Sequence, residues 1–507
     1  MTPLVHATTP GGYLLVLAVI LPVCAVLAIV ACGPRSAARI AMVTLAAGLA
    51  IAVAIAAELI SSGAALSYVV GAWQPPLGIA LRADGLSGAM LVMTALVVVA
   101  VGLFARVQHG LDEGARDGRA QTTFWLMLLA LWSALNAVFV GEDLFNLYVA
   151  LELLTFAAVP LVCLDGRSKT IMAALRYLLF ALLGSLLYLL GTGLLYGQYG
   201  TLDLLALSRL SRQDPALSVA LALMIVGLLA KAALFPLHLW LPPAHAGAPA
   251  PASAVLSALV IKAPVFLILR LVLDVAPPQA AAIAGQLLAV LGAASILFCS
   301  VMALRQARLK LMIAYSTVAQ IGYLFIVFPL AAGSADLPPW GTIAWTGGAL
   351  QLVSHALAKA AMFLAAGVIA EAFGHDRIAD LGGFGRVLPL SAAAFGLAGL
   401  SLMGIPPSGG FVAKCLLLTA AVIGGYPWLA ATILIGGLLA GGYVFRVIDK
   451  ALAVPTVPVK TLRPIPRRLE FAALALAVAA VLIGFVPLRP FGFLQIGRDG
   501  LAMALTP

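Results

Sequence analysis

Long apolar runs dominate this 507-residue sequence and constrain its fold more than any other feature. A run of about 20 apolar residues is long enough to cross the hydrocarbon core of a bilayer as a helix. Only 9% of the residues are charged, whereas soluble domains carry about a quarter, so a water-soluble domain, a disordered chain and a nucleic-acid-binding protein are excluded. The sequence predicts an all-α membrane protein with about fourteen transmembrane helices, at about 13–32, 38–61, 84–106, 121–140, 143–164, 171–196, 217–241, 250–273, 280–302, 311–331, 341–372, 388–424, 427–448 and 470–488.

Lysine and arginine residues are distributed unevenly between alternate loops. The loops on one side carry eighteen of them, and the loops on the other side together with the C-terminal tail carry five. The positive-inside rule places the first set in the cytoplasm. This puts both termini on the outer side, which requires an even number of spans. We therefore expect a multi-pass protein of the inner (plasma) membrane with external termini.

Cysteine and histidine residues give no sign of a metal site. The five cysteines lie in apolar stretches without paired spacing, and we expect free, buried thiols: Cys24, Cys32, Cys163, Cys299 and Cys415. No cluster of histidine, cysteine and carboxylate residues has ligand spacing, and no haem, iron–sulfur or flavin signature occurs. We therefore expect neither a metal nor a cofactor.

Four lysines lie deep inside the predicted spans, at Lys231, Lys262, Lys359 and Lys414. A lysine at the centre of a membrane-spanning helix costs about 2.5–3.5 kcal/mol on insertion scales, and such residues usually face a bundle interior or a hydrated path. For any one lysine, a structural ion pair or a snorkelling side chain is the alternative. The set of four favours a hydrated path.

Glu152 is the single acid, of nineteen, that lies in the middle of a predicted span. A nearby ammonium would keep this carboxylate ionised, and burial conversely favours loss of the proton from a lysine. Opening a Glu152–Lys231 pair would remove the partner charge and favour proton release. We therefore interpret these two residues as a proton switch.

Histidines extend this interpretation. His355 and Lys359 are spaced i, i+4 and share one helix face, so we expect both in a proton relay. His238 lies seven residues after Lys231 and is an accessory candidate, as is Arg176. Arg176 and Arg270 each lie nearer the end of a predicted span, where a long basic side chain can snorkel to the membrane surface. The remaining histidines read as ordinary loop or tail residues: His6, His109, His245 and His375.

Two spans contain helix breaks next to a lysine. Lys231 is followed by Pro236 and further prolines, and the Gly-Ile-Pro-Pro-Ser-Gly-Gly stretch at 404–410 precedes Lys414. Unpaired backbone at membrane depth occurs where it is buried in protein or lines a wet cavity, and paired breaks are typical of inverted repeats in transporters. Two unrelated proline kinks are the alternative. The predicted division is 1–120 for the N-terminal helices, 121–273 for a first inverted repeat, 280–449 for a second, and 450–507 for the last helix and tail.

Five segments together resemble the antiporter-like subunits shared by Mrp-type cation/proton antiporters, respiratory complex I and membrane-bound hydrogenases. The segments are Asp143 to Glu152, Lys231 with the Phe-Pro-Leu-His-Leu-Trp-Leu-Pro stretch at 235–242, Lys262, His355 to Phe363, and Gly404 to Lys414. The Asp-Leu-Phe-Asn-Leu-Tyr stretch at 143–148 is most similar to the D-type subunit of Mrp antiporters, and the stretch at 231–251 is nearer to hydrogenase-type members. The resemblance implies fourteen helices with two inverted five-helix repeats and broken helices seven and twelve.

The resemblance also implies roles for individual residues. Glu152 matches the glutamate of the family's fifth helix, and Lys231 matches the lysine of the broken seventh helix. Lys262, His355 and Lys359 match relay positions on the eighth and eleventh helices. Lys414 matches the terminal position on the twelfth helix, where some members have glutamate. Together these residues imply a hydrated axis along which protons pass.

The function implied is a proton-translocating subunit of a multi-subunit membrane complex of the Mrp cation/proton antiporter type. Its partners would be other membrane subunits, and its ions would be protons with sodium or another monovalent cation. A proton-pumping subunit of an NADH–quinone oxidoreductase or membrane-bound hydrogenase is the alternative, in which redox chemistry would lie on other chains. A stand-alone solute carrier would need a polar binding cluster beyond this axis. A purely structural subunit would leave four buried lysines unexplained.

Overall fold

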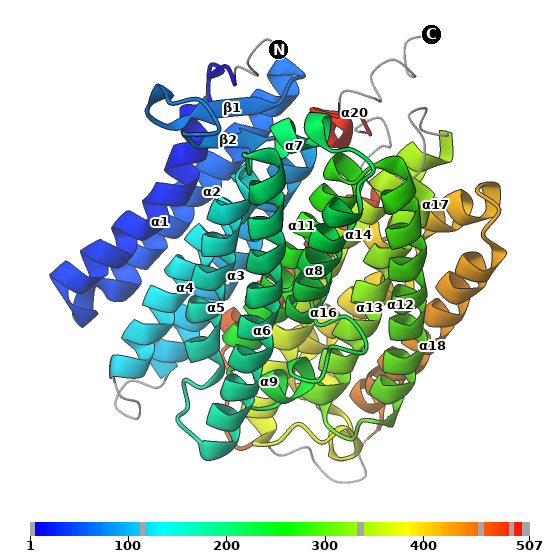
Figure 1. Cartoon of the computed structure of the whole chain (residues 1–507). Helices are drawn as coiled ribbons and strands as arrows, with labels where there is room; N and C mark the ends of the chain where they lie inside the picture. The colour runs from blue at the N-terminus through cyan, green and yellow to red at the C-terminus, as the bar shows by residue number, and fades with distance from the viewer. Residues whose placement is uncertain (1–5, 112–117, 332–338, 455–460, 486–490, 499–507) are drawn as a thin grey trace.

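The computed structural model describes residues 6–111, 118–331, 339–454, 461–485 and 491–498, which form a tall helical bundle (Figure 1). Twelve of its helices are long and apolar enough to cross a membrane. They are α1 (Tyr13–Cys32), α2 (Ala37–Ser62), α3 (Gly85–Leu111), α4 (Gly118–Val140), α5 (Leu144–Val162), α6 (Ser168–Tyr199), the stretch Ala250–Val275, α12 (Pro278–Arg305), α13 (Leu309–Ala331), α14 (Pro339–Phe373), α18 (Pro427–Leu452) and α19 (Arg467–Leu482). The prediction of an all-α membrane protein is confirmed.

Three shorter apolar helices, α8 (Pro215–Lys231), α16 (Pro389–Met403) and α17 (Gly409–Ile423), occur in the described residues where the sequence predicts interrupted spans. α8 ends at the first break, and α9 (Leu241–Gly247) follows it. α16 and α17 flank the second break. Counting each interrupted stretch as one crossing would give fourteen spans, and this number stays a prediction.

The stretch Ala250–Val275 is not a uniform α-helix. It consists of α10 (Ala250–Val255), a π-helical segment η3 (Leu256–Val260), α11 (Lys262–Arg270) and a second π-helical segment η4 (Leu271–Val275). π-Helical turns change which backbone carbonyls are paired and are frequent at functional sites.

Several short elements gather at one end of the bundle (Figure 1). The strands β1 (Leu66–Val69) and β2 (Ala80–Ala83) form an antiparallel hairpin, a small departure from an all-helical chain. The helices α7 (Leu204–Leu210) and α20 (Phe491–Gln495) lie at the same end, and α9 lies at the other. The remaining short helices are η1 (Pro34–Ser36), η2 (Val70–Ala72), η5 (Ile378–Asp380), α15 (Phe384–Val387) and η6 (Ile483–Phe485).

Glycines allow close helix crossings in the bundle. A Cβ atom on Gly227 of α8 would lie 2.2 Å from the carbonyl oxygen of Gly184 in α6, and one on Gly322 of α13 would lie 2.4 Å from that of Gly292 in α12. Small residues at such crossings let backbones approach closely where no hydrophobic effect drives helices together. The α6–α8 crossing brings the end of α8 beside the middle of α6.

The cysteines are free, but the expectation that all are buried is wrong. Cys24 and Cys32 are exposed on α1, Cys163 and Cys415 are partly exposed, and Cys299 is buried. α1 also exposes Leu27 and Val30 at its surface. In a membrane protein an apolar stretch faces lipid as readily as protein, so apolar sequence context alone does not predict burial inside the bundle.

The same backbone connection occurs at opposite ends of the bundle. An antiparallel bridge joins Asp143, just before α5, to Asp203, just after α6. A second bridge joins Arg308, just before α13, to Arg377, just after α14. In each case the bridge clasps the two ends of a consecutive helix pair.

Candidate functional site

Lys231 and Glu152 form a direct ion pair inside the bundle. The Nζ atom of Lys231 lies 2.9 Å from the Oε1 atom of Glu152 and donates a second hydrogen bond of 3.1 Å to the hydroxyl of Thr155. The hydroxyl of Ser185 donates to the same Glu152 oxygen. The side chains of Lys231 and Glu152 are 6% and 14% exposed, so water screens their attraction weakly. The structure brings together the two residues that the sequence predicts as a switch.

The break in the helix places Lys231 at the end of α8. The partial negative charge at a helix C-terminus favours an ammonium group at this position. Beyond the end, Ala233 has a φ of 54°, a left-handed conformation that is uncommon for a residue other than glycine. The indole N–H of Trp240 donates 2.9 Å to the carbonyl of Ala230, which also accepts from the backbone N–H of Ala233 at 3.3 Å.

A small cavity beside Lys231 leads toward the next helix. Its volume is about 10 Å³, and its lining includes Lys231, Tyr177, Val260 and Pro264. That volume is close to the minimum for one water molecule. It adjoins the helical stretch that carries Lys262.

Lys262 is fully buried and is held by a backbone carbonyl. Its Nζ atom donates a 2.6 Å hydrogen bond to the carbonyl oxygen of Ser257, in the π-helical segment η3. The hydroxyl of Ser257 pairs with that of Thr317 in α13 at 2.8 Å. The irregular helix therefore supplies both an acceptor for the lysine and a polar contact to the second half of the chain.

Lys359 and His355 lie one turn apart on α14, as their spacing predicts. The Nζ atom of Lys359 donates 3.2 Å to the carbonyl oxygen of Ile313 and also donates to the hydroxyl of Ser316. Among the described residues, neither ring nitrogen of His355 has a hydrogen-bond partner, although the side chain is buried. α14 packs against η3, which precedes Lys262, and against α17, which carries Lys414, so the structure places the predicted relay residues on neighbouring elements.

Lys414 lies just after the second break. Its Nζ atom donates a 2.5 Å hydrogen bond to the carbonyl oxygen of Leu402, in the last turn of α16, and sits 4.3 Å from the centre of the Tyr323 ring. Gly404 ends α16 in a left-handed conformation with φ of 82°. Because the last carbonyls of a helix lack intrahelical partners, the break itself provides the acceptor that holds the lysine.

The three later lysines therefore differ from Lys231. Within the described ranges, no carboxylate lies in ion-pair distance of Lys262, Lys359 or Lys414, and each donates to a backbone carbonyl instead. A carbonyl accepts from an ammonium and from a neutral amine alike. We call these residues, with Lys231, Glu152 and His355, the lysine axis.

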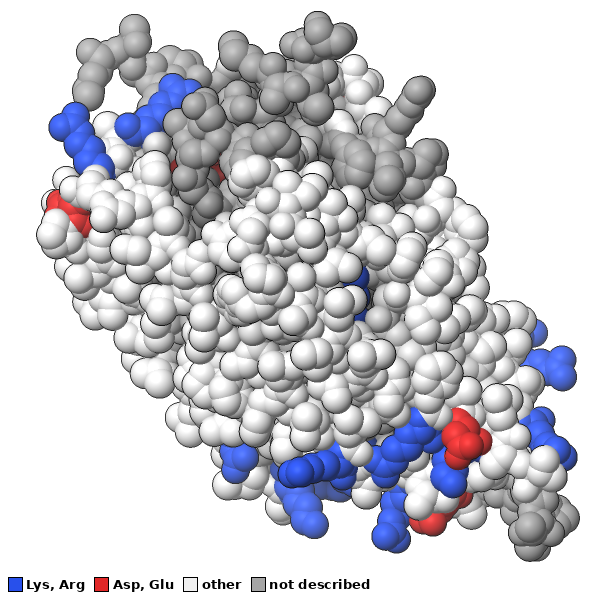
Figure 2. All heavy atoms as spheres, turned by 90° about the vertical axis from the view of Figure 1, so that its right-hand side faces the viewer, with Lys and Arg blue, Asp and Glu red and all other residues white. Residues whose placement is uncertain are grey.

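A groove opens beside Lys414 on the surface of α17 and α18. Its volume is about 820 Å³, and Met403, Ile405, Lys414, Leu438 and Phe445 are among its mostly apolar lining residues. Figure 2 shows this side of the molecule as an almost uncharged band with a basic side chain recessed in a hollow, and with Lys and Arg gathered along the lower rim.

His245 belongs to the site, although its sequence context predicts an ordinary loop residue. It is fully buried in α9, and its ring stacks on Phe363 of α14 with centroids 4.6 Å apart. The sequence holds one signal that could have identified it: His245 and His238 are the only ionisable residues between Lys231 and Lys262.

The two accessory candidates lie apart from the axis. His238 is buried among Phe235, Phe298 and Tyr315, with ring centroids 5.5, 6.2 and 6.4 Å away. Arg176 is exposed on the surface of α6, and no ion pair or hydrogen bond of its guanidinium to an axis residue is found in the described part of the chain.

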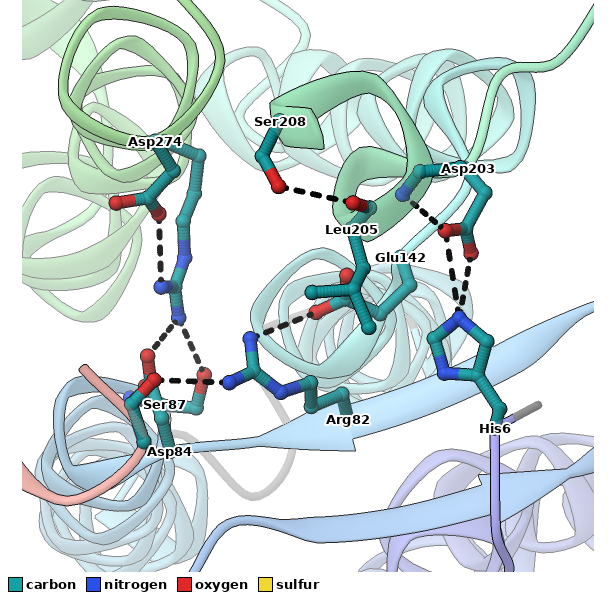
Figure 3. A network of polar contacts seen from close by, with 12 residues as sticks. His6, Arg82, Asp84, Ser87, Glu142, Asp203, Leu205, Ser208 and Asp274 are labelled. Atoms are coloured by element: carbon teal, nitrogen blue, oxygen red, sulfur yellow. Dashed lines mark hydrogen bonds and ion pairs between the residues drawn. The ribbon is translucent and has the colours of Figure 1, made fainter. Parts of the chain in front are cut away.

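A second set of buried charges, which sequence reasoning missed, lies at the hairpin end of the bundle (Figure 3). His6 is 3.2 Å from Asp203, and Arg82 is 3.9 Å from Glu142. Arg270, predicted only as a snorkelling side chain, is 2.6 Å from Asp84 and 3.2 Å from Asp274. We call this set the hairpin clasp, consisting of His6, Arg82, Asp84, Glu142, Asp203, Arg270 and Asp274.

Burial and pairing shift the proton affinities of the hairpin clasp. Burial raises the pKa of Glu142 to about 7 against the opposing effect of Arg82. The hydrogen bond to Asp203 raises the pKa of His6. Burial works against ionisation of Asp84, but the charge of Arg270 and the Ser87 N–H outweigh it and lower the pKa of that carboxyl.

Comparisons with known proteins agree with this architecture. Residues 141–440 match the family described as NADH:quinone oxidoreductase/Mrp antiporter, TM. The chain is 37% identical over 449 residues to NADH-quinone oxidoreductase subunit N of Desulforudis audaxviator, covering 86% of each protein. It is 30% identical over 376 residues to the D-type Na(+)/H(+) antiporter subunit of Alkalihalophilus pseudofirmus, covering 73% of this chain and 72% of the relative. A chain of the Mrp complex from Dietzia sp. superposes with a TM-score of 0.85 at 25% identity, over 96% of both chains.

Proposed function

The chain belongs to the NADH:quinone oxidoreductase/Mrp antiporter family of membrane proteins, and from this we propose that it carries protons across the membrane as one subunit of a multi-subunit complex. The observation that carries the proposal is the 2.9 Å ion pair between Lys231 and Glu152, buried at the end of a broken helix. An ion pair at this depth costs free energy unless it is closely matched. An ion pair that opens and closes during proton transfer would explain why the chain retains charges that cost this free energy.

In the proposed mechanism, separation of Glu152 from Lys231 removes the charge that favours the ammonium form, so Lys231 releases its proton. The small cavity beside it would hold the water that passes the proton toward Lys262. His355 and Lys359 would then relay it to Lys414. Each carbonyl-bound lysine on this route can hold either protonation state without losing its acceptor.

We assign the two predicted repeats, 121–273 and 280–449, to two halves of this path. The paired backbone bridges at Asp143–Asp203 and at Arg308–Arg377 support an inverted relationship, because they join equivalent ends of helix pairs at opposite ends of the bundle. The two helix breaks, each next to a lysine, support the same division.

We further propose that both termini face outward from the inner (plasma) membrane. The rim of lysines and arginines in Figure 2 supports this orientation, because positive loops remain in the cytoplasm. A reporter fused after residue 460 should read as cytoplasmic, and one at the C-terminus should read as external. The reverse result would reject the orientation.

An Mrp-type antiporter, in which protons exchange for sodium or another monovalent cation, is our first candidate for the complex. The TM-score of 0.85 with a chain of an Mrp complex, over 96% of both chains, supports it. The second candidate is a redox-driven quinone oxidoreductase, which the 37% identity with an N-type subunit of such an enzyme supports. Transport in proteoliposomes separates the two, since a sodium gradient should drive protons in the first and NADH with a quinone in the second.

The decisive test of proton carriage is Lys231→Ala in the intact complex. We expect proton transport to be abolished with assembly preserved, because the variant removes the switch and leaves the apolar contacts of α8. Lys169→Ala, at an exposed position at the start of α6, is the matched control and should transport as the wild type does. Wild-type transport by Lys231→Ala would refute the proposed function.

A further inference from the structure

Two buried glutamines beside the second break are not used by the proposed path. Gln320 of α13 and Gln351 of α14 are both fully buried, and a buried amide costs free energy unless it is hydrogen-bonded. The side-chain N–H of Gln351 donates 3.2 Å to the side-chain oxygen of Gln320. Gln320 in turn donates 3.2 Å to the carbonyl oxygen of Leu402, in the last turn of α16. The two amides therefore form a hydrogen-bonded chain that ends at the break.

The carbonyl oxygen at which this chain ends is also the acceptor of Lys414, whose Nζ atom donates 2.5 Å to it. In an uninterrupted helix the N–H group four residues later would donate to this oxygen. That residue is Pro406, which has no N–H group. A carbonyl oxygen has two lone pairs, so it can accept from Gln320 and Lys414 together, as it does here.

The amide of Gln320 is held in one orientation. A carbonyl oxygen accepts and does not donate, so the nitrogen of the Gln320 amide must face Leu402. Its oxygen then faces the N–H of Gln351. Gln351 lies four residues before His355 and eight before Lys359, on one side of α14. The two amides therefore join the helix that carries two relay residues to the acceptor of Lys414.

A separate pair of hydroxyls holds the other side of the break. The hydroxyls of Ser354 in α14 and Ser401 in α16 lie 2.8 Å apart. The Ser401 hydroxyl also accepts 3.2 Å from the backbone N–H of Gly410, at the start of α17. These bonds do not involve Gln320, so they continue to join the break to α14 when Gln320 is replaced.

We propose that Gln320 is a positioning residue for Lys414, which sets the direction of the lysine amine by holding the carbonyl oxygen that the two side chains share. The inference rests on the proposed function and adds to it a residue that does not itself carry the proton. Without Gln320, this oxygen would lie at a helix end with the mobile lysine side chain as its remaining side-chain donor among the described residues. A displacement of about 1 Å in such a contact can lower a rate by about 100-fold.

Three variants separate positioning from a structural role. Gln320→Met removes the donor to Leu402, and methionine has a similar length and adapts to the space. Gln320→His is the rescue variant, because a neutral imidazole has one donor and one acceptor, as this site requires. Gln351→Met is the matched control, since it removes a buried amide from the same chain and leaves the bond from Gln320 to Leu402 in place.

The test measures proton transport by the intact complex in proteoliposomes with an internal pH-sensitive dye, at equal protein content, beside thermal unfolding of the same preparations. We expect Gln320→Met to lose about tenfold or more in rate, and Gln320→His and Gln351→Met to stay within about threefold of the wild type. The two methionine variants should unfold at similar temperatures, because each loses bonds of one buried amide. A large difference in transport at equal stability is a result that a structural role alone would not give.

Wild-type transport by Gln320→Met would overturn the positioning role. Equal losses in the two methionine variants would also overturn it, and so would a Gln320→His variant as slow as Gln320→Met. If Gln320→Met does not assemble, Gln320→Leu takes its place with the same expectation.

Lys231→Ala, measured in the same preparation, separates this failure from that of the proposed function. If Lys231→Ala is inactive while Gln320→Met is fully active, proton carriage stands and the positioning role alone is wrong. If Lys231→Ala is also fully active, both are wrong.

Discussion

The lysine axis and the hairpin clasp are both built from buried charges, but they hold these charges by different means. In the hairpin clasp each arginine meets carboxylates, as Arg270 meets Asp84 and Asp274. In the lysine axis one lysine meets a carboxylate, and the other three meet backbone carbonyls. The basic residues themselves also differ, since the axis contains lysine and histidine where the clasp contains mainly arginine.

Under the proposed function, this difference distinguishes the lysine axis, which we propose carries protons, from the hairpin clasp, where each arginine is paired with a carboxylate. Lysine and histidine lose a proton in proteins when their surroundings favour it, whereas arginine does not. Arginine also offers a rigid fork that matches carboxylates. We therefore interpret the hairpin clasp as a set of ion pairs that joins distant chain segments, and the lysine axis as the residues that carry protons in the proposed function.

The largest expected effect separates two buried glutamates. Glu152→Gln keeps the shape of the side chain but leaves Lys231 without its counter-charge, and proton transport should fall by at least about 100-fold. Glu142→Gln makes the same change in the hairpin clasp and should leave transport within about twofold. Proteoliposome transport at equal expression measures both, and equal effects would erase the distinction between the two regions.

The second effect concerns charge that can and cannot exchange. Lys414→Arg keeps a positive charge but removes the ability to release a proton, so transport should fall by about tenfold or more. Lys414→Glu should be tolerated better, because a carboxyl exchanges protons. An active arginine variant beside an inactive glutamate variant would make Lys414 a fixed structural charge, and the proton path would have to leave the axis elsewhere.

The third effect should appear in stability with little change in transport. Arg270→Ala leaves Asp84 buried without its partner, and removal of one member of a buried pair costs about 3–5 kcal/mol. Arg270→Lys keeps the charge and should restore most of this loss. Thermal unfolding of the purified complex should give the highest melting temperature for the wild type, a lower one for Arg270→Lys and the lowest for Arg270→Ala. A loss of transport as large as that of Glu152→Gln would instead place Arg270 on the proton path.

The smallest effect is a pH dependence confined to the hairpin clasp. In the folded chain the pKa of Glu142 is about 7, against an ordinary value of 4.5, so the folded state holds this proton more tightly than the unfolded chain. The resulting contribution to the free energy of unfolding is fully present below pH 4.5 and is lost as the pH rises through 7. His6, whose pKa is also raised, acts in the same direction. Between pH 5.5 and 8 the clasp should lose about 2 kcal/mol. Glu142→Gln should remove most of the resulting fall in melting temperature, and an unchanged fall would mean that Glu142 is ionised in the folded protein.

Charge and spacing were enough to predict much of the axis. Glu152 and Lys231 are 79 positions apart in the sequence, and the structure joins them in an ion pair. Pairing could be predicted because an unpaired charge in a low-dielectric interior costs free energy that an opposite charge partly offsets. The two breaks also appear where proline and glycine interrupt apolar runs. These predictions succeeded because each rests on a cost that a membrane imposes locally on the chain.

The parts that the sequence did not reveal depend on long-range contacts. His6, Arg82 and Asp203 each read as a single loop charge, and the fold alone brings them to one place. His245 read as a loop residue because prolines surround it, although α9 turns inward and buries it. Cys24 and Cys32 were expected to be buried, but both are exposed on the bundle surface, because hydropathy does not distinguish a lipid-facing side from a protein-facing one.

The carbonyls of Ser257, Ile313 and Leu402 have a consequence for genetic experiments. These oxygens belong to the main chain, so a change of side chain at those positions does not remove the acceptor itself. An alanine scan would find the lysines of the axis but would not remove the carbonyl that accepts from Lys262 or from Lys414. Their contacts would respond instead to an amide-to-ester replacement in the backbone, or to an insertion that shifts the helix register by one residue.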